Sequence, residues 1–383
     1  MALRVIALFC ASLFEVSCSF HGGSPIPPTA MPHSLSAFAF DTALASSATI
    51  IPSTLPIVTD TNPSTAGVFL GEVCDDTAVV SCPNFASTFR HSLSFGVVYA
   101  NWDDDIGTYV ARRQISAWPA LGITPLITWQ PESAMTPITY AAINSGAYDA
   151  YIKTTADEIA ALGFTIFLRP FHEFNGRWYP WGLANQGAST AADADFIAAW
   201  KRMVGIFRTE HATNVKFVWC FATNSVPSEK QNPWNSPTVA YPGDAFVDWI
   251  AFDMYNRGSS TGLPWVSFDT VVAPSYQKAL VISSAKPVMI AELASNEYGD
   301  GGAAKAAWIA QMLADLKSPT ASDNYSHLRA LAWFDSNLRG YTYDLASSQA
   351  VYDEWVTATR SLGPGGILNF RGNATAFNAV TSP

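Results

Sequence analysis

Charged residues, and basic ones in particular, are scarce in this sequence. They occupy 14% of 383 positions, and 21 Lys and Arg against 31 Asp and Glu give a formal net charge of −10. Proteins that bind nucleic acid or anionic membrane surfaces by charge need basic clusters. We therefore expect neither a nucleic-acid nor a membrane partner. Hydrophobic residues occupy 49% of the chain, which excludes wholesale disorder, since disorder requires low hydrophobicity.

Cysteine is also scarce, with five residues in the chain. No Cys and His residues stand at the spacing of a zinc site, so we expect no metal and no cofactor. Cys74 and Cys82 are close enough in sequence to form a local disulfide in an oxidising compartment, or else remain two free thiols. Cys220 lies in an apolar run and is interpreted as a small buried hydrophobic residue.

No apolar stretch approaches the ~20 residues of a membrane-spanning helix. The N-terminus instead has one basic residue, a short apolar run and small residues near position 18, which predicts a signal peptide over residues 1–19. Residues 20–65 are rich in Ser, Thr, Pro and Ala and are predicted to form a low-complexity arm or linker. We expect a secreted, extracellular protein whose catalytic domain covers residues 66–383.

From residue 67 onward, short apolar runs alternate with amphipathic stretches. Eight such runs are continuous rather than alternating, as expected of parallel strands covered on both faces: residues 67–71, 93–99, 125–129, 164–168, 215–221, 249–255, 287–291 and 330–334. Helical spacing follows several of them, for example over 106–121, 140–162 and 351–362. The pattern predicts an α/β fold, a single (β/α)8 TIM barrel. An open doubly wound sheet is the alternative, but no Gly-rich phosphate loop follows the first strand.

Polar side chains follow these strands at the end where barrel enzymes carry their active sites. Glu173 follows the fourth strand and Glu292 ends the seventh. Hydrolysis of a glycosidic bond uses two such carboxyl groups, one as acid and one as nucleophile or base. Aromatic residues make up 13% of the chain and suit stacking on sugar rings. Each glutamate alone is also explained by a salt bridge or a helix cap.

The run Arg169-Pro-Phe-His-Glu-Phe-Asn-Gly-Arg-Trp-Tyr-Pro-Trp181 closely resembles the signature of glycoside hydrolase family 26. That family contains endo-β-mannanases, mixed-linkage β-glucanases and some xylanases. Further blocks resemble the family in the same order, and the resemblance spans about residues 67–362: 217–219, 241–244, 247–249, 253–256 and 286–292.

The resemblance implies a retaining mechanism in which Glu173 is the acid/base and Glu292 the nucleophile, with carboxyls about 5–5.5 Å apart. It implies that His172 binds the sugar at the cleavage point and that Tyr255 hydrogen-bonds Glu292. The rest of the predicted sugar-binding set comprises Trp178, Trp333, Trp129 and Asn175. Arg169 is expected to brace the barrel interior rather than contact sugar.

We predict a secreted endo-acting glycosidase, a monomer whose partner is a β-linked polysaccharide, either β-1,4-mannan or mixed-linkage β-1,3-1,4-glucan. Trp129-Gln130-Pro131 looks more like the glucan-cleaving branch, because many mannanases of the family carry a histidine there. Two other hypotheses stay open. One is a non-catalytic carbohydrate-binding protein on the same barrel, since a fold does not dictate a function. The other is a wall-bound structural protein tethered by the arm.

Overall fold

A computed structural model describes residues 50–57, 68–74, 81–133, 138–258, 262–297, 299–317, 325–360, 370–371 and 373–381. All of these belong to one unit, Ala48–Pro383. The predicted signal peptide lies outside the described residues, and the predicted arm is described only over 50–57. Secretion therefore stays a prediction.

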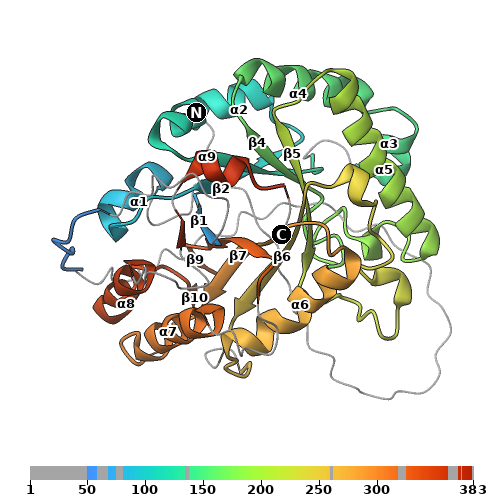
Figure 1. Cartoon of the computed structure of the whole chain (residues 1–383). Coiled ribbons are helices and arrows are strands. Elements are labelled where there is room, and N and C mark those ends of the chain that lie inside the picture. The colour runs from blue at the N-terminus through green and yellow to red at the C-terminus, as the bar shows by residue number, and fades with distance from the viewer. Residues whose placement is uncertain are drawn as a thin grey trace, which may run out of the picture. The chain divides into compact units, whose positions relative to one another are not determined.

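Eight parallel strands form a closed barrel (Figure 1). In chain order they are β1 Val68–Val73, β2 Phe95–Asn101, β3 Thr124–Gln130, β4 Ile166–Pro170, β5 Val215–Ala222, β6 Trp249–Asn256, β7 Val288–Ser295 and β8 Leu328–Trp333. Each strand pairs with the next, and β8 pairs with β1, where Leu331 lies beside Leu70. This closure confirms the predicted barrel and shows that the open-sheet alternative is wrong. A short strand, β11 Phe370–Arg371, also pairs with β1, at Val68 and Phe69.

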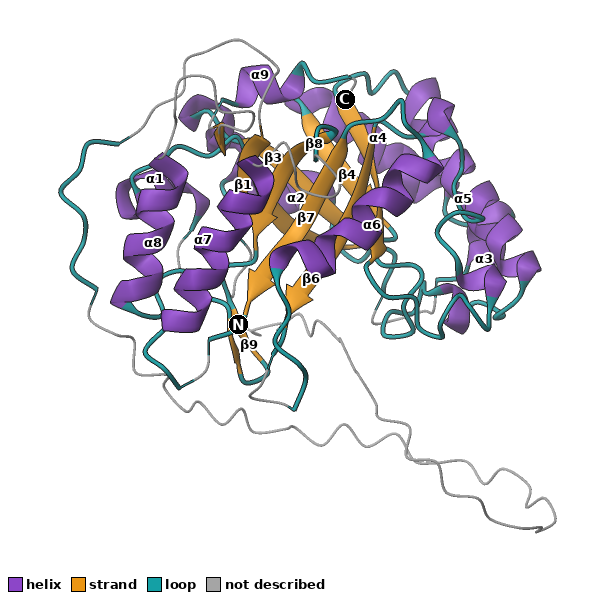
Figure 2. Cartoon of the chain, turned by 60° about the horizontal axis from the view of Figure 1, so that its bottom comes forward, coloured by secondary structure: helices purple, strands orange, loops and turns teal. Residues whose placement is uncertain are grey.

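Helices surround the strands, with α1, α7 and α8 on one side and α3 and α5 on the other (Figure 2). The described α-helices are α1 Cys82–Phe89, α2 Ile106–Arg112, α3 Tyr140–Asn144, α4 Asp149–Leu162, α5 Thr190–Thr209, α6 Phe268–Ile282, α7 Ala303–Lys317, α8 Gln349–Arg360 and α9 Ala374–Asn378. The helix predicted over 140–162 is two helices, because the chain turns at Gly146 with φ +88°. Helices α1, α6 and α9 were not predicted from the sequence.

The N-terminal end of the barrel is closed by α9. Its Phe377 is fully buried and stacks on Phe167 and Phe95, with ring centroids 4.4 and 4.8 Å away. Phe69 and Trp249 contact the same ring from two further strands. A C-terminal segment thus fills the bottom of the barrel core, so access to the interior is left to the opposite end.

Cys74 and Cys82 form a disulfide with Cα atoms 5.5 Å apart, linking the end of β1 to the start of α1. Cys220 is a free, buried thiol, as predicted. Residues 50–57 lie against α8, where the backbone N–H of Ser53 donates to the hydroxyl of Tyr352. Among the described helices, none is both long enough and apolar enough to cross a membrane.

Candidate active site

A β-bulge immediately precedes Glu292 within β7. Asp253 of β6 lies opposite Glu292, whereas Phe252, the residue before Asp253, lies opposite Ile290. Ala291 is therefore an extra residue in β7. Bulges increase local twist and re-aim the side chains that follow them, and they are frequent beside active sites. Here the bulge sets the direction in which the Glu292 carboxylate projects.

Three side chains donate hydrogen bonds to the Glu292 carboxylate. The Tyr99 hydroxyl and Arg169 Nη2 both donate to Oε1 at 2.5 Å, and the Tyr255 hydroxyl donates to Oε2. Glu292 is 2% exposed, so these donors replace the water that would otherwise solvate its charge. The Tyr255 hydroxyl stays protonated as a donor, because burial and then the charge of Glu292 raise its pKa. The predicted bond from Tyr255 is present.

Arg169 is completely buried and links three strands. Besides Glu292, its guanidinium contacts both carboxylate oxygens of Asp253, at 2.9 and 3.1 Å. Its Nε and Nη2 also donate to the hydroxyl of Thr128 at 2.9 and 2.7 Å. Arg169 braces the barrel interior, as predicted. It also holds Glu292, the nucleophile candidate, in place, a role that was not predicted from the sequence.

Glu173 sits in an unusual loop directly after β4. Phe171 and Glu173 both have left-handed backbone conformations, with φ of +52° and +53°. Such conformations are costly for residues other than glycine, and they concentrate at functional sites. The loop also requires Gly176, because a Cβ there would lie 2.4 Å from the ring of Trp178. That close approach lets Trp178 Nε1 donate to Glu173 Oε2 at 2.6 Å.

The electrostatics of the two glutamates differ. Glu173 is 4% exposed, and burial followed by the negative charge of Glu292 raises its pKa to about 7. The bond from Trp178 and the charges of Arg257 and Arg169 oppose this rise. The two carboxyls are thus close enough to interact. Glu173 favours its protonated form, whereas Glu292 is paired with the cation of Arg169. Environments that differ in this way assign acid and base roles in enzymes.

His172 directly precedes Glu173 in the loop after β4, and its ring lies 6.1 Å from that of Tyr99. Its ring packs 4.5 Å from Tyr179 and 5.4 Å from Trp181. Neither ring nitrogen has a hydrogen-bond partner among the described residues. Burial and the charge of Arg169 hold the pKa of His172 well below its usual range, so the ring is neutral. A buried polar group left without a partner is costly, and a ligand hydroxyl would satisfy it. Sugar binding by His172 and Trp178 remains a prediction.

Three predicted sugar-binding residues are placed where they cannot contact a sugar. Trp333 is fully buried and points outward from the barrel, packing on Trp308 and Trp355 of α7 and α8. Trp129 is likewise buried, in the layer between the barrel and its helices, with its ring 5.8 Å from Tyr151 of α4. Side chains alternate along a strand, so both tryptophans face away from the interior.

Asn175 is the third correction. It is fully buried, and its amide bonds the backbone of Ala222 in both directions at 2.8 Å while also donating to Ser225. These bonds tie the loop after β4 to the end of β5. Asn175 is therefore a structural residue of the site rather than a ligand-binding one.

Tyr99 was not among the predicted site residues. Its hydroxyl reaches Glu292 from β2, and its ring lies under the guanidinium of Arg169, 5.8 Å from Cζ to centroid. In the structure Tyr99 pairs with Thr128 of β3, which itself bonds Arg169, so both side chains lie on the inner face. No local signal in the sequence gives this face, because it depends on the register of the strand.

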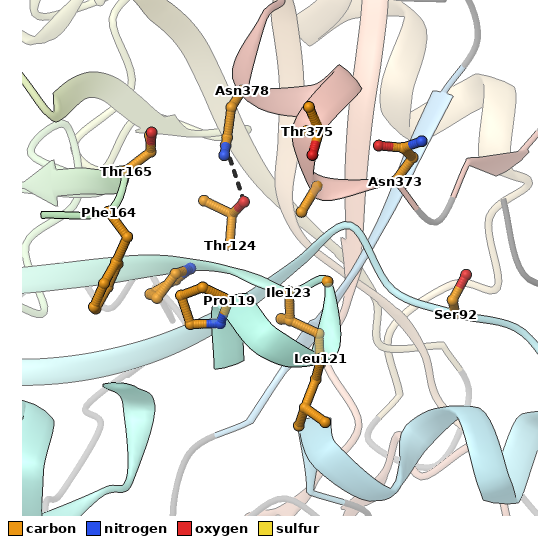
Figure 3. Close-up of a pocket in the computed structure, with 13 residues that line it drawn as sticks. Ser92, Pro119, Leu121, Ile123, Thr124, Phe164, Thr165, Asn373, Thr375 and Asn378 are labelled. Carbon is orange, nitrogen blue, oxygen red and sulfur yellow. Dashed lines mark hydrogen bonds between the residues drawn. The ribbon is translucent and has the colours of Figure 1, made fainter. Parts of the chain in front are cut away.

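A cavity of about 410 Å³ lies at the opposite end of the barrel, beside α9 (Figure 3). Its lining includes Thr124, whose hydroxyl donates to Asn378 at 2.9 Å, together with Leu121 and Phe164. Its lining carries no ionisable side chain. The cavity therefore lacks groups for acid–base chemistry, in contrast with the end that carries Glu173 and Glu292.

A model of glycosyl hydrolase family 26 matches residues 136–312, a segment that contains both glutamates. Endoglucanase H of Acetivibrio thermocellus is 34% identical over 275 residues, covering 71% of this chain and 28% of that protein. Mannan endo-1,4-beta-mannosidase A and B of Caldalkalibacillus mannanilyticus is 34% identical over 102 residues, covering 26% of this chain and 18% of that protein. The chain thus spans less than a third of the length of these relatives.

Solved structures show the same fold. An endo-beta-1,4-mannanase double mutant from Cellulomonas fimi aligns with a TM-score of 0.59 at 18% identity, covering 86% of this chain and 80% of that one. The family match, the relatives, the closed barrel and the two glutamates, one after β4 and one within β7, together show that the chain belongs to glycosyl hydrolase family 26.

Proposed function

We propose that the protein is a retaining endo-glycosidase in which Glu173 is the acid/base and Glu292 the nucleophile. The observation that carries the proposal is the contrast between the two carboxyls. Glu173 is buried with a pKa raised to about 7, and Glu292 accepts bonds from Tyr99, Arg169 and Tyr255. One group is thus suited to deliver a proton at neutral pH, and the other to carry negative charge.

In the first step Glu292 attacks the anomeric carbon while Glu173 protonates the departing glycosidic oxygen, giving a glycosyl-enzyme and a free aglycone. In the second step Glu173 takes a proton from water, which displaces Glu292 and restores both carboxyls. The donors on Glu292 hold it in line throughout. Neutral His172, with two unpartnered nitrogens, is suited to bonding a hydroxyl of the sugar at the cleavage point.

For the substrate we favour a β-linked glucan. A relative whose alignment covers 71% of this chain is named an endoglucanase. The end of β3 carries Gln130 where many mannanases of the family carry a histidine, and the Oε1 of this buried side chain lacks a partner among the described residues. β-1,4-Mannan is the second candidate, supported by the mannanase names of the other relatives. We further propose that the protein is secreted, since a polymeric substrate lies outside the cell.

The experiment measures reducing-end release from mixed-linkage glucan, galactomannan and glucomannan by wild-type protein and by Glu173→Gln and Glu292→Gln. We expect a loss of at least a thousandfold in kcat for each variant. Product anomers followed by NMR should show retention. Full activity in either variant would refute the assignment. Tight polysaccharide binding without any hydrolysis by the wild type would favour the carbohydrate-binding alternative.

A further inference from the structure

A ladder of three tyrosine rings leads from the nucleophile candidate to the surface. Tyr255, bonded to Glu292, packs against Tyr343 with ring centroids 5.4 Å apart. Tyr343 is buried and stacks on Tyr341 at 5.4 Å, with an angle of 5° between the ring planes. Tyr341 is only half-buried. Since one face of its ring lies on Tyr343, the exposed part of Tyr341 is its outer side.

Tyr341 belongs to a tight hairpin that follows β8. The strands β9 Asn337–Leu338 and β10 Tyr341–Thr342 are joined by Arg339 and Gly340, both with positive φ, which two-residue hairpins of type I′ require. A two-residue loop leaves the strands little freedom. The ring of Tyr341 is therefore held at a defined place.

The hairpin is also fastened to the barrel at its base. Trp333 Nε1 donates to the carbonyl of Tyr343 at 2.8 Å, and the backbone N–H of Thr342 donates to Asn296 Oδ1 at 2.8 Å. Glu297, next after Asn296, donates its backbone N–H to the Thr342 carbonyl at 3.1 Å. Buried Trp333 thus positions the ladder instead of stacking on sugar itself.

The hairpin lies beyond the arrowheads of β6 and β7, at the end of the barrel that carries both glutamates (Figure 2). In a closed barrel of eight strands, β8 stands opposite β4. Glu173 and Trp178 follow β4, and an acid must lie beside the leaving group that it protonates. A polysaccharide that lies across this end of the barrel places its aglycone, the leaving side, over β4. Its glycone side then lies over the hairpin that follows β8.

We propose that Tyr341 forms a glycone-side subsite that stacks on a sugar unit beyond the one at the cleavage point. Half-exposed aromatic rings held rigidly present an apolar face to the C–H surface of a sugar at little entropic cost. The subsite rests on the proposed endo-glycosidase function. It makes the enzyme more efficient on long chains than on short ones, because binding energy from a remote unit is used in the transition state.

The test compares Tyr341→Ala and Tyr341→Phe with wild type on mixed-linkage gluco-oligosaccharides and on β-1,4-manno-oligosaccharides of two to six units. We expect the ratio of kcat/KM on the longest to the shortest cleaved oligosaccharide to fall about fivefold or more in Tyr341→Ala. Tyr341→Phe keeps the ring and should keep the wild-type ratio. In Tyr341→Ala, the lengths of the labelled products released from reducing-end-labelled chains should also change, because the glycone end of the chain is no longer anchored.

Three outcomes overturn the subsite. An unchanged ratio in Tyr341→Ala excludes a contact with a remote unit. An equal loss on all lengths, including loss through misfolding, assigns Tyr341 a purely structural role behind Tyr343 and Tyr255. A wild type inactive on both oligosaccharide series and on polysaccharide refutes the proposed function itself, and the subsite with it.

Discussion

Arg169 and Glu292 form a buried ion pair, with Nη2 2.5 Å from Oε1 and side chains 0% and 3% exposed. The same guanidinium also forms an ion pair with Asp253, with Nη1 2.9 Å from Oδ1. Two carboxylates thus share one cation within the barrel. A buried pair of this kind contributes little net stability compared with apolar packing, but removing one partner is expensive. Its role here is to fix the position of the Glu292 carboxylate.

We predict that Arg169→Met destabilises the protein by about 3–5 kcal/mol, because Asp253 and Glu292 are left buried without a cation. Activity should fall at least a hundredfold. Urea unfolding and kcat measure the two effects. The matched control is Arg112→Met, which removes a pair to Asp104 on a side chain that is 61% exposed, where a change within about 1 kcal/mol is expected. If the free energy of unfolding of Arg169→Met were as high as that of Arg112→Met, the prediction would be contradicted.

Loss of one donor to Glu292 should impair catalysis without unfolding the barrel. Tyr255→Phe removes only the hydroxyl that bonds Oε2 and leaves the ring packed against Tyr343. A hydrogen bond to a charged group is worth about 1.5–3 kcal/mol, so kcat/KM should fall about 10- to 100-fold. Tyr241→Phe is the control, since its hydroxyl bonds Asp244 in the loop before β6. Equal activity of the two variants would show that the Tyr255 bond is not used.

The eight strands were predictable because each is a continuous apolar run, and that pattern survives in any parallel barrel. The two glutamates were predictable because Glu292 directly follows such a run and Glu173 comes shortly after another. Trp333 and Trp129 were misassigned for the same reason. They also stand at strand ends, and position in a strand says nothing of the face until the strand's start is known, since one residue of error reverses inside and outside.

Other features depended on contacts between distant segments. The bulge at Ala291 requires the register of β7 against β6, and the Tyr99 bond to Glu292 joins residues 193 positions apart. The plug formed by Phe377 comes from a five-residue helix too short to show periodicity. None of these leaves a local pattern in the sequence, because tertiary packing alone determines them.

The pH dependence of activity should report Glu173. Its pKa of about 7 predicts that kcat/KM falls above neutral pH as the acid loses its proton. The Trp178 bond stabilises the charged carboxylate and lowers this pKa. Trp178→Phe should therefore move the midpoint of the alkaline limb upward, by about one pH unit. Trp181→Phe removes an indole that bonds only the backbone of His172 and should leave the midpoint in place. A downward move in Trp178→Phe would contradict the prediction.

The same titration should appear in stability. The pKa of Glu173 rises from 4.5 to about 7 on folding, so the folded state keeps a proton that the unfolded state loses. Between these two values the free energy of unfolding falls as pH rises, and above pH 7 the loss is complete, at up to about 3 kcal/mol. The side-chain amide introduced by Glu173→Gln cannot ionise, so this variant escapes the loss. The variant should therefore match wild type near pH 4 and become more stable than wild type by pH 8, as measured by urea unfolding at both values. A stability difference that is constant with pH would show that Glu173 titrates alike in both states.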